Sequence, residues 1–477
     1  MIRDPVFTTI RPLMMKPLRL LFVLALVPTL AQAQATDPKV LERELLEELI
    51  EINTSDSAGK TREAAEAMAR RLVGAGFPAA DVRVMGPEPK YQSLVARYRG
   101  RNPTRKPILL MAHLDVVDAR KEDWTFDPYQ FRELDGYYYG RGTSDNKAGA
   151  AMLVANFIRY RQEGFVPERD LIIVLTADEE TASNSIKWLV GQQRPLVDAE
   201  YALNTDAGGG ELQDGKPVVF SVQTAEKVYL SFQLEVRNKG GHSSVPVADN
   251  AIYRLSDGLS RLAKYTFPVT LTETSRAFFE RGAAAQPPAI AADMRAVART
   301  GDAAAARRLS EVPLYNSTLR TTCVATRLFG GHADNALPQL ARATVNCRLL
   351  PGYSPDSAQA LLARIVADTA IHITRIAEPT ASPASPLRAD IMEPIERLAR
   401  SMWPGVTIVP EMSTGATDGL YVRNAGIPVY GVSAVFERVD DIRAHGRDER
   451  IGVKAYHDAA RFWYELVKTL SSTKPGV

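Results

Sequence analysis

The sequence predicts an α/β protein, and three observations lead to this fold class. Aliphatic runs such as Leu171–Leu175 are typical of strands buried on both faces, and acidic or histidine residues follow them. Segments with helical periodicity lie between these runs. The chain of 477 residues, 45% apolar and 24% charged, is long enough for two or three globular domains.

Residues 1–33 have the pattern of an export signal. Basic residues precede an apolar run over 20–30, and Ala31–Ala33 forms a typical cleavage site; Met14 or Met15 is an alternative start of translation. We therefore expect a periplasmic or secreted protein without a stable membrane anchor. Removing the signal takes away four basic residues and one acid, which changes the net charge from +2 to −1. This near-neutral balance gives no case for binding nucleic acid.

The first elements expected after the signal are two helices and then three strands, over 38–53, 59–76, 81–85, 93–98 and 107–112. The last of these strands leads into His113 and Asp115. Side chains i and i+2 of a strand share a face, so these two would point the same way. The spacing suits a metal-binding imidazole that is oriented by a carboxylate. For such a pair on its own, a core histidine with a polar neighbour is the commoner explanation.

The glycine-rich segment Gly140–Gly149 precedes an expected helix over 148–161. Its three glycines allow tight turns. A phosphate-binding loop is excluded because the glycine spacing matches neither nucleotide-binding pattern, and because Asp145 would repel an anion. A carboxylate displayed in such a turn is better explained as a ligand of a cation.

The acidic segment Thr176–Glu180 directly follows the aliphatic run that ends at Leu175. The carboxyl ends of strands are where α/β proteins bind ligands. Neighbouring side chains of an extended segment point in opposite directions, so Glu179 and Glu180 can serve as proton acceptor and metal ligand. Taken alone, these acids are better explained as a solvated helix N-terminus. Another apolar strand ends in Asp206, which adds a further acid at a strand end.

In their order along the chain, these segments resemble the co-catalytic zinc family of glutamate carboxypeptidase, aminoacylase, carnosinase and succinyl-diaminopimelate desuccinylase. Each matching motif is weak alone, but together they span nearly the whole chain after the signal. The matching motifs are 111–117, 140–147, 176–180, 204–206, 239–244, 346–352, 413–418 and 444–446.

The resemblance implies two zinc ions per chain, with manganese or cobalt as possible substitutes. The implied ligands are His113, Asp145 and Asp206 for one ion, and Asp145, Glu180 and His445 for the other. It further implies Glu179 as general base and Asp115 as the residue that steadies His113. Three protein ligands and one open position per ion are typical of catalytic sites.

The resemblance also implies a catalytic domain with a mixed central sheet flanked by helices, over 34–225 and 380–477. An α+β lid over 226–379 would be inserted in it and would pair two subunits as a homodimer. The implied substrate contacts are Arg348, Asn335, Gly415 and Thr417, and His242 would complete the partner subunit's site. The stretch 275–309 is expected to be helical and enlarges the lid, and packing filler is the favoured interpretation of its role.

Cys323 and Cys347 are the only cysteines and lie on two expected strands. An exported protein meets an oxidising compartment, but sequence does not give the separation of the two Cα atoms. A disulfide and a pair of buried thiols are therefore equally compatible with the sequence. Three histidines outside the motifs, His332, His372 and His457, are interpreted as structural.

We predict an enzyme that hydrolyses the amide bond of small peptides with a free C-terminal carboxylate, as a carboxypeptidase or dipeptidase. An N-acyl amino acid deacylase is the alternative, because side-chain specificity depends on lid loops. A catalytically inactive binding protein is disfavoured by the presence of Glu179 together with a full ligand set. A phosphatase or nuclease is disfavoured because basic residues are lacking around the acids.

Overall fold

The computed structural model describes residues 1–2, 4–9 and 37–472. The chain divides into two units, 1–36 and 37–477, and the fold below is that of the second. Most of the predicted export signal, including its apolar run and cleavage site, lies outside the described residues. Within the described residues, no helix is both long and apolar enough to cross a bilayer.

A ten-stranded mixed sheet forms the centre of the large layer, in the order β1-β2-β6-β3-β7-β17-β9-β8-β18, with β16 paired to β9. Strands β6, β3, β7 and β17 run parallel. Strand β2 runs antiparallel to β1 and β6, and β9 runs antiparallel to β17 and β8 but parallel to β16. The strands are β1 (Val82–Met85), β2 (Ser93–Tyr98), β3 (Ile108–His113), β6 (Leu171–Thr176), β7 (Tyr201–Asn204), β8 (Gly209–Gln213), β9 (Lys216–Glu226), β16 (Thr407–Ser413), β17 (Val429–Gly431) and β18 (Phe436–Arg438).

Helices cover both faces of this sheet, which explains the continuous aliphatic runs of its strands. On β3, Ile108 and Leu110 face one hydrophobic core, whereas Leu109 and Met111 face the other. Helices of the first core are α1 (Pro38–Glu51), α2 (Thr61–Gly74), α3 (Lys147–Gln162), α12 (Ala389–Met402) and α14 (Val453–Ser472). Those of the second are α4 (Asn184–Gln192), α5 (Arg194–Val197) and α13 (Gly419–Asn424). The predicted α/β class with a mixed sheet is confirmed.

Small elements complete this layer. A three-stranded sheet consists of β4 (Arg132–Leu134), β5 (Tyr137–Tyr139) and β19 (Arg450–Gly452). Short 3-10 helices span Ala79–Asp81, Lys121–Asp123, Ala283–Ala285 and Val439–Asp441.

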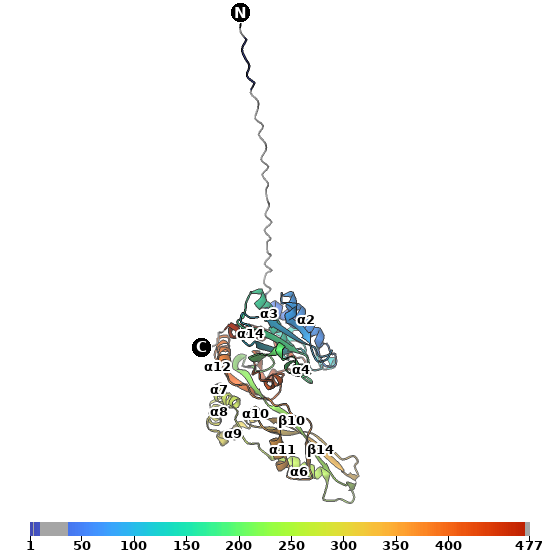
Figure 1. The fold of residues 1–477 in the computed structure, drawn as a ribbon. Helices are drawn as coiled ribbons and strands as arrows, with labels where there is room; N and C mark the ends of the chain where they lie inside the picture. The colour runs from blue at the N-terminus through green and yellow to red at the C-terminus, as the bar shows by residue number, and fades with distance from the viewer. Residues whose placement is uncertain (3, 10–36, 473–477) are drawn as a thin grey trace. The chain divides into compact units, whose positions relative to one another are not determined.

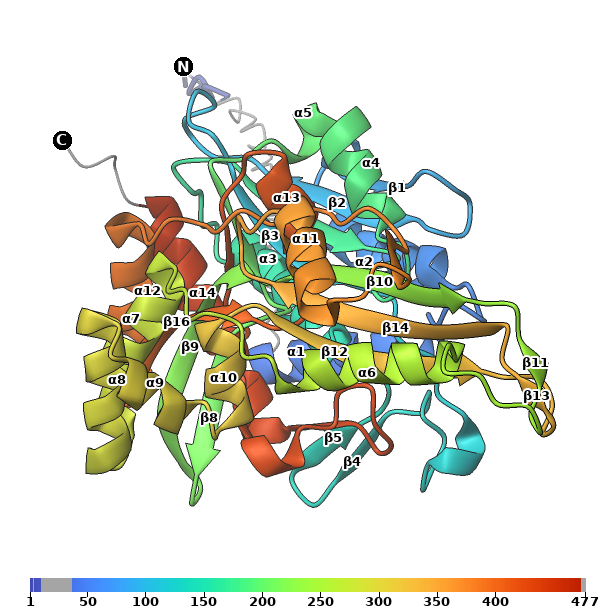
Figure 2. The same cartoon turned by 90° about the horizontal axis from the view of Figure 1, so that it is seen from below.

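A second, four-stranded antiparallel sheet has the order β12-β14-β10-β15. Its central strands β10 and β14 are labelled in Figure 1. Its strands are β10 (Val228–Arg237), β12 (Thr322–Gly330), β14 (Leu340–Leu349) and β15 (His372–Arg375). Two helices, α6 (Ala251–Lys264) and α11 (Pro355–Val366), cover one face and share its core, and Figure 2 shows α6 running beside β12 and β14. A sheet covered by two helices is what we expected of an inserted α+β lid. The boundaries of the lid at residues 226 and 379 stay a prediction. A two-stranded ribbon, β11 (Gly241–His242) with β13 (Ala336–Leu337), extends from this sheet.

The stretch predicted to be helical forms a separate group: α7 (Glu273–Gly282), α8 (Pro288–Thr300), α9 (Ala303–Leu309) and α10 (Pro313–Leu319). Phe279, Met294 and Val297 belong to a core of its own. Helix α7 packs against β16, and Arg281 pairs with Glu396 of α12 at 2.6 Å. The group therefore packs against the ten-stranded sheet, although the sequence analysis counted it with the lid.

Two open questions are answered by the fold. Cys323 and Cys347 lie opposite each other on β12 and β14 and form a disulfide. The His457 side chain is 8% exposed, with its Nδ1 atom 2.5 Å from the Glu42 carboxylate and its Nε2 atom 3.1 Å from the hydroxyl of Tyr138. This contact joins α14 to α1 and β5, which agrees with the structural role expected for His457.

Candidate metal centre

The five predicted metal ligands meet at one edge of the ten-stranded sheet. His113 ends β3, while Glu180 and Asp206 follow its two parallel neighbours β6 and β7. Because the carboxyl ends of parallel strands lie at the same edge, these three side chains converge there. Asp145 comes from the loop before α3, and His445 from the loop before β19.

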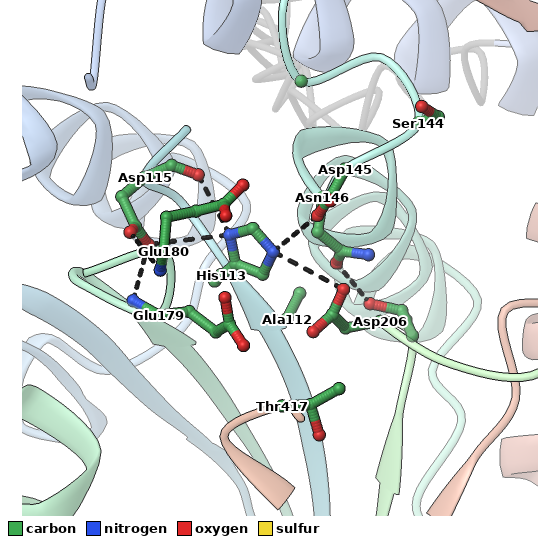
Figure 3. A network of polar contacts seen from close by, with 12 residues as sticks. Ala112, His113, Asp115, Ser144, Asp145, Asn146, Glu179, Glu180, Asp206 and Thr417 are labelled. Carbon is green, nitrogen blue, oxygen red and sulfur yellow. Dashed lines mark hydrogen bonds and ion pairs between the residues drawn. The ribbon is translucent and has the colours of Figure 1, made fainter. Parts of the chain in front are cut away.

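Asp145 lies between the two histidines and faces each with a different oxygen. Its Oδ1 atom is 2.8 Å from His113 Nε2, and its Oδ2 atom is 3.0 Å from His445 Nε2. Asp206 Oδ1 lies 3.5 Å from His113 (Figure 3), and Glu180 Oε1 lies 3.0 Å from His445. The arrangement separates into two groups that share Asp145, as expected for a carboxylate that bridges two ions.

The donor atoms fit metal ions in type and spacing. Ligand atoms of His113, Asp145 and Glu180 all lie within 4.8 Å of one another, and so do those of His113, Glu179 and Asp206. Imidazole nitrogen and carboxylate oxygen are the ligands found in catalytic zinc sites. Glu179, predicted as the base, is thus also close enough to be a ligand, and its role stays a prediction.

Carboxylates are crowded at this site, and no lysine or arginine of the described residues forms an ion pair with Asp145, Glu179, Glu180 or Asp206. Burial raises the pKa of Asp206 to about 6. Burial, and then the charge of Asp206, raise the pKa of Glu179 well above its usual value. Hydrogen bonds with Asp145 and Glu180 raise the pKa of His445 to about 10. The cluster therefore favours bound positive charge, whether protons or metal ions.

Asp115 holds the site together through both its backbone and its side chain. Its carbonyl oxygen accepts a hydrogen bond from His113 Nδ1 at 2.9 Å, which leaves Nε2 free to face Asp145. Its carboxylate accepts the backbone N–H groups of Glu179 and Glu180 at 3.1 and 2.9 Å. Asp115 thus orients His113 mainly by its carbonyl, while its carboxylate fixes the two glutamates.

The third acid of the segment, Asp178, has a different role. Its carboxylate accepts the backbone N–H groups of Asn184 and Ser185 at 2.6 and 2.9 Å, at the start of α4. The interpretation of the three acids as a helix N-terminus is therefore correct for Asp178. This residue is buried, however, and not solvated as that interpretation assumed.

Glu449 is a positioning residue that sequence reasoning missed. One oxygen of its buried carboxylate accepts the backbone N–H groups of Gly142, Ser144 and Asp145 at 2.9–3.1 Å. The other accepts the buried Arg141 guanidinium at 2.6 Å. Glu449 stands in a run of charged residues, so the sequence offers no signal that distinguishes it from solvated neighbours.

The predicted substrate residues lie in two places. Thr417 lines the metal-ligand pocket, but its hydroxyl is buried and donates to Glu226 at 2.7 Å. Gly415 is exposed in the same loop. Arg348, on β14, donates to the carbonyl of Thr414 at 3.0 Å and lies 4.8 Å from the ring of Tyr229.

His242 and Asn335 lie together at the exposed β11–β13 ribbon, where the carbonyl of Asn335 accepts the N–H of Ser243 at 3.0 Å. Neither of them, nor Arg348, lines the pocket around the metal ligands. The structure therefore brings together the five ligands, Glu179 and Thr417, but not the lid residues.

The pocket itself has a volume of about 270 Å³. Its lining contains acidic, small and polar residues and no apolar side chain larger than alanine. The lining residues are Asp145, Glu179, Glu180, Asp206, Ala207, Gly208, Glu411, Ser413, Ala416, Thr417 and His445.

An α/β sheet with two histidines and several carboxylates gathered beside a small pocket at one edge is typical of the class of metal-dependent hydrolases. The chain belongs to peptidase family M20/M25/M40, whose family model matches residues 109–469. This confirms the resemblance inferred from the sequence motifs. The protein is accordingly an enzyme, a metallohydrolase of the peptidase and amidohydrolase type.

Three known proteins illustrate the similarity. The chain is 29% identical to human N-fatty-acyl-amino acid synthase/hydrolase PM20D1 over 390 residues, which cover 80% of this chain and 77% of that protein. The M20 metallo-carboxypeptidase Sso-CP2 from Sulfolobus solfataricus has a TM-score of 0.67 at 17% identity, covering 90% of this chain and 99% of that one. Human carnosine dipeptidase 1 has a TM-score of 0.60 at 16% identity, covering 91% and 98%. At these identities the two solved structures support the fold alone.

Proposed function

We propose that the protein hydrolyses the amide bond of small peptides that carry a free C-terminal carboxylate, with two zinc ions held by His113, Asp145, Glu180, Asp206 and His445. The observation that carries this proposal is the small polar pocket beside two histidine–carboxylate groups that share Asp145. Zinc ions bound there would lower the pKa of a water molecule to about 7 and so supply the nucleophile.

Glu179 is the proton acceptor in this proposal. Its carboxylate lies beside His113 in Figure 3, and among the described residues no hydrogen bond engages it. Its raised pKa, caused first by burial, suits a group that takes a proton from the attacking water and gives it to the leaving nitrogen. Asp115 keeps Glu179 in place through the backbone hydrogen bond described above.

Arg348 is proposed to bind the substrate carboxylate. No carboxylate within residues 37–472 forms an ion pair with it, and partial burial lowers the pKa of its guanidinium. A planar guanidinium that lacks an acidic partner in the protein is suited to bind the carboxylate of a ligand. Gly415 stands next to Thr414, the residue to which Arg348 donates.

We also propose a homodimer through the lid, in which His242 serves the partner's site. Strand β12 is an edge of its sheet, and its side chains Val324, Leu328 and Phe329 are 56–69% exposed. Exposed apolar side chains on an unpaired edge favour pairing with another chain. Mixing inactive His242→Ala and Glu179→Gln subunits should restore activity, because one site of the heterodimer would be complete. Absence of recovery despite demonstrated subunit exchange would contradict the shared site.

Hydrolysis of N-acyl amino acids is the second candidate, and the similarity to human N-fatty-acyl-amino acid synthase/hydrolase favours it. The pocket favours the peptidase instead, since a long acyl chain would lie against acidic side chains. A screen of zinc-loaded protein with dipeptides, short N-acyl and N-fatty-acyl amino acids decides between the two. Turnover of dipeptides at the higher kcat/KM is expected; cleavage of N-fatty-acyl substrates alone would overturn the proposal.

We further propose that residues 1–33 direct export and are then removed. The Cys323–Cys347 disulfide supports an oxidising compartment. N-terminal sequencing of the protein purified from its natural host should begin at Gln34, and a mature chain that keeps residues 1–33 would contradict export by this signal.

A further inference from the structure

Glu411 is an acid of the active-site pocket to which neither the metal centre nor the proposed chemistry assigns a role. It lies on β16, two residues before Ser413, and both side chains line the pocket with the metal ligands. On the neighbouring strand β9, Ser221 lies near it, and the Ser221 hydroxyl donates to the carbonyl of Gly209 at 3.4 Å. Within residues 37–472, no lysine, arginine or histidine forms an ion pair with it.

The charges around the pocket leave Glu411 uncompensated. Three of the five pocket acids, Asp145, Glu180 and Asp206, would be neutralised by two divalent ions and a bound hydroxide. Glu179 exchanges its proton in the reaction. Glu411 then remains the one lining carboxylate without a counter-charge, and a buried carboxylate is costly unless it is paired.

Burial increases this demand for positive charge. It raises the pKa of Glu411, the effect of taking a charged carboxylate out of water. Glu411 has no basic partner in the described chain, so a cation at this end of the pocket would offset the cost of burying it.

We propose that Glu411 determines specificity by binding a protonated amine of the substrate. The chemical class is an ammonium or guanidinium group, supplied by the free α-amino group of a dipeptide or by a basic side chain. This inference rests on the proposed function, and it deepens that function by naming a cationic peptide as the preferred substrate. Together, Arg348 and Glu411 would require a carboxylate and a cation on one substrate.

Matched substrates test this reading and separate the two sources of the cation. In the first pair Ala-Ala is compared with N-acetyl-Ala-Ala, which lacks the amine but keeps the same scissile bond. In the second pair, N-acetyl-Lys-Ala is compared with N-acetyl-norleucyl-Ala. In the third, N-acetyl-Ala-Lys is compared with N-acetyl-Ala-norleucine. The wild-type enzyme should prefer the cationic member of at least one pair by about 10- to 100-fold in kcat/KM, the range for a hydrogen bond to a charged group.

The variant Glu411→Gln should abolish that preference, because it keeps the shape of the side chain but removes its charge. The expected signature is a loss confined to cationic substrates, with unchanged kcat/KM for neutral ones and unchanged metal content. The matched control is Glu437→Gln, since Glu437 is another poorly exposed acid of the same sheet and lines a different pocket. This control should leave the preference intact.

Calorimetric binding to the inactive Glu179→Gln protein gives a readout that does not depend on turnover. Cationic members of the preferred pair should bind more tightly than neutral ones, and the double variant with Glu411→Gln should not discriminate. Equal binding of cationic and neutral members overturns the role of Glu411, even if peptides are cleaved. Failure of every peptide as a substrate, with N-fatty-acyl amino acids cleaved, overturns the proposed function instead, and the binding comparison still decides the role of Glu411.

Discussion

Replacing Glu449 with glutamine should lower both the stability of the fold and its affinity for metal. The Glu449 carboxylate is fully buried, and the Arg141 side chain is 3% exposed. Among the described residues, Glu449 is the only ion-pair partner of Arg141. Glutamine keeps the volume but removes the charge, so a guanidinium is left buried without its partner. Breaking a buried pair in this way costs about 3–5 kcal/mol.

The effect on metal follows from the three backbone N–H groups that one Glu449 oxygen accepts. These groups belong to Gly142, Ser144 and Asp145, so the loop that presents the proposed bridging ligand would lose its anchor. Arg141 also donates to the carbonyl of His445 at 3.3 Å, which couples the loss to a second ligand. Outer residues that orient ligands typically contribute about 10- to 100-fold in metal affinity.

Thermal unfolding of metal-free protein and titration against a competing chelator measure the two effects separately. The matched control is Glu42→Gln, which breaks another buried contact, with His457, on elements away from the metal ligands. Both variants should unfold at lower temperature, but only Glu449→Gln should bind metal more weakly. Wild-type metal affinity in a folded Glu449→Gln protein would refute the positioning role.

Three further expectations concern single groups. Glu179→Gln should keep about two metal ions per chain while kcat collapses, whereas Glu180→Gln should lose metal; metal analysis showing the reverse would exchange their roles. Arg348→Ala should lower kcat/KM for peptides with a free carboxylate far more than for their C-terminal amides, and equal losses would indicate a structural role. Burial raises the pKa of Glu437 to about 7, so its folded form holds a proton that the unfolded form releases near pH 4.5. Stability should therefore fall as pH rises from about 4.5 to 7, and Glu437→Gln should raise Tm at pH 8 but not at pH 4.

The strand-end positions of three proposed ligands could be predicted because two local signals coincide. An aliphatic run identifies a buried strand, and a polar residue at its end identifies a position that packing does not explain. Parallel neighbours then bring His113, Glu180 and Asp206 to one edge without any knowledge of long-range contacts. The position of Asp145 was found by the chemistry of its glycine-rich turn rather than by periodicity.

Other features depend on contacts between distant segments and have no local signal. Glu449 acts on a loop 304–308 residues away, and in sequence it resembles any exposed acid. Predicting the disulfide would have required the register of β12 against β14, which places Cys323 opposite Cys347. The packing of α7 against β16 could not be predicted either. The alanine-rich composition of this stretch indicates a helix but not the surface against which it packs.

The two proposed metal positions differ in burial, and this difference follows from the parts of the chain that form them. The side chains of His113 and Asp206 are 2% and 14% exposed, and both stand at the ends of central strands. His445 is 53% exposed and reaches Glu180 from a loop of the C-terminal segment. Ligands on rigid, buried strands are preorganised, whereas a loop must be ordered when the ion binds. The ion between Glu180 and His445 should therefore leave first, so that a chelator removes metal in two steps and His445→Ala abolishes only the faster one.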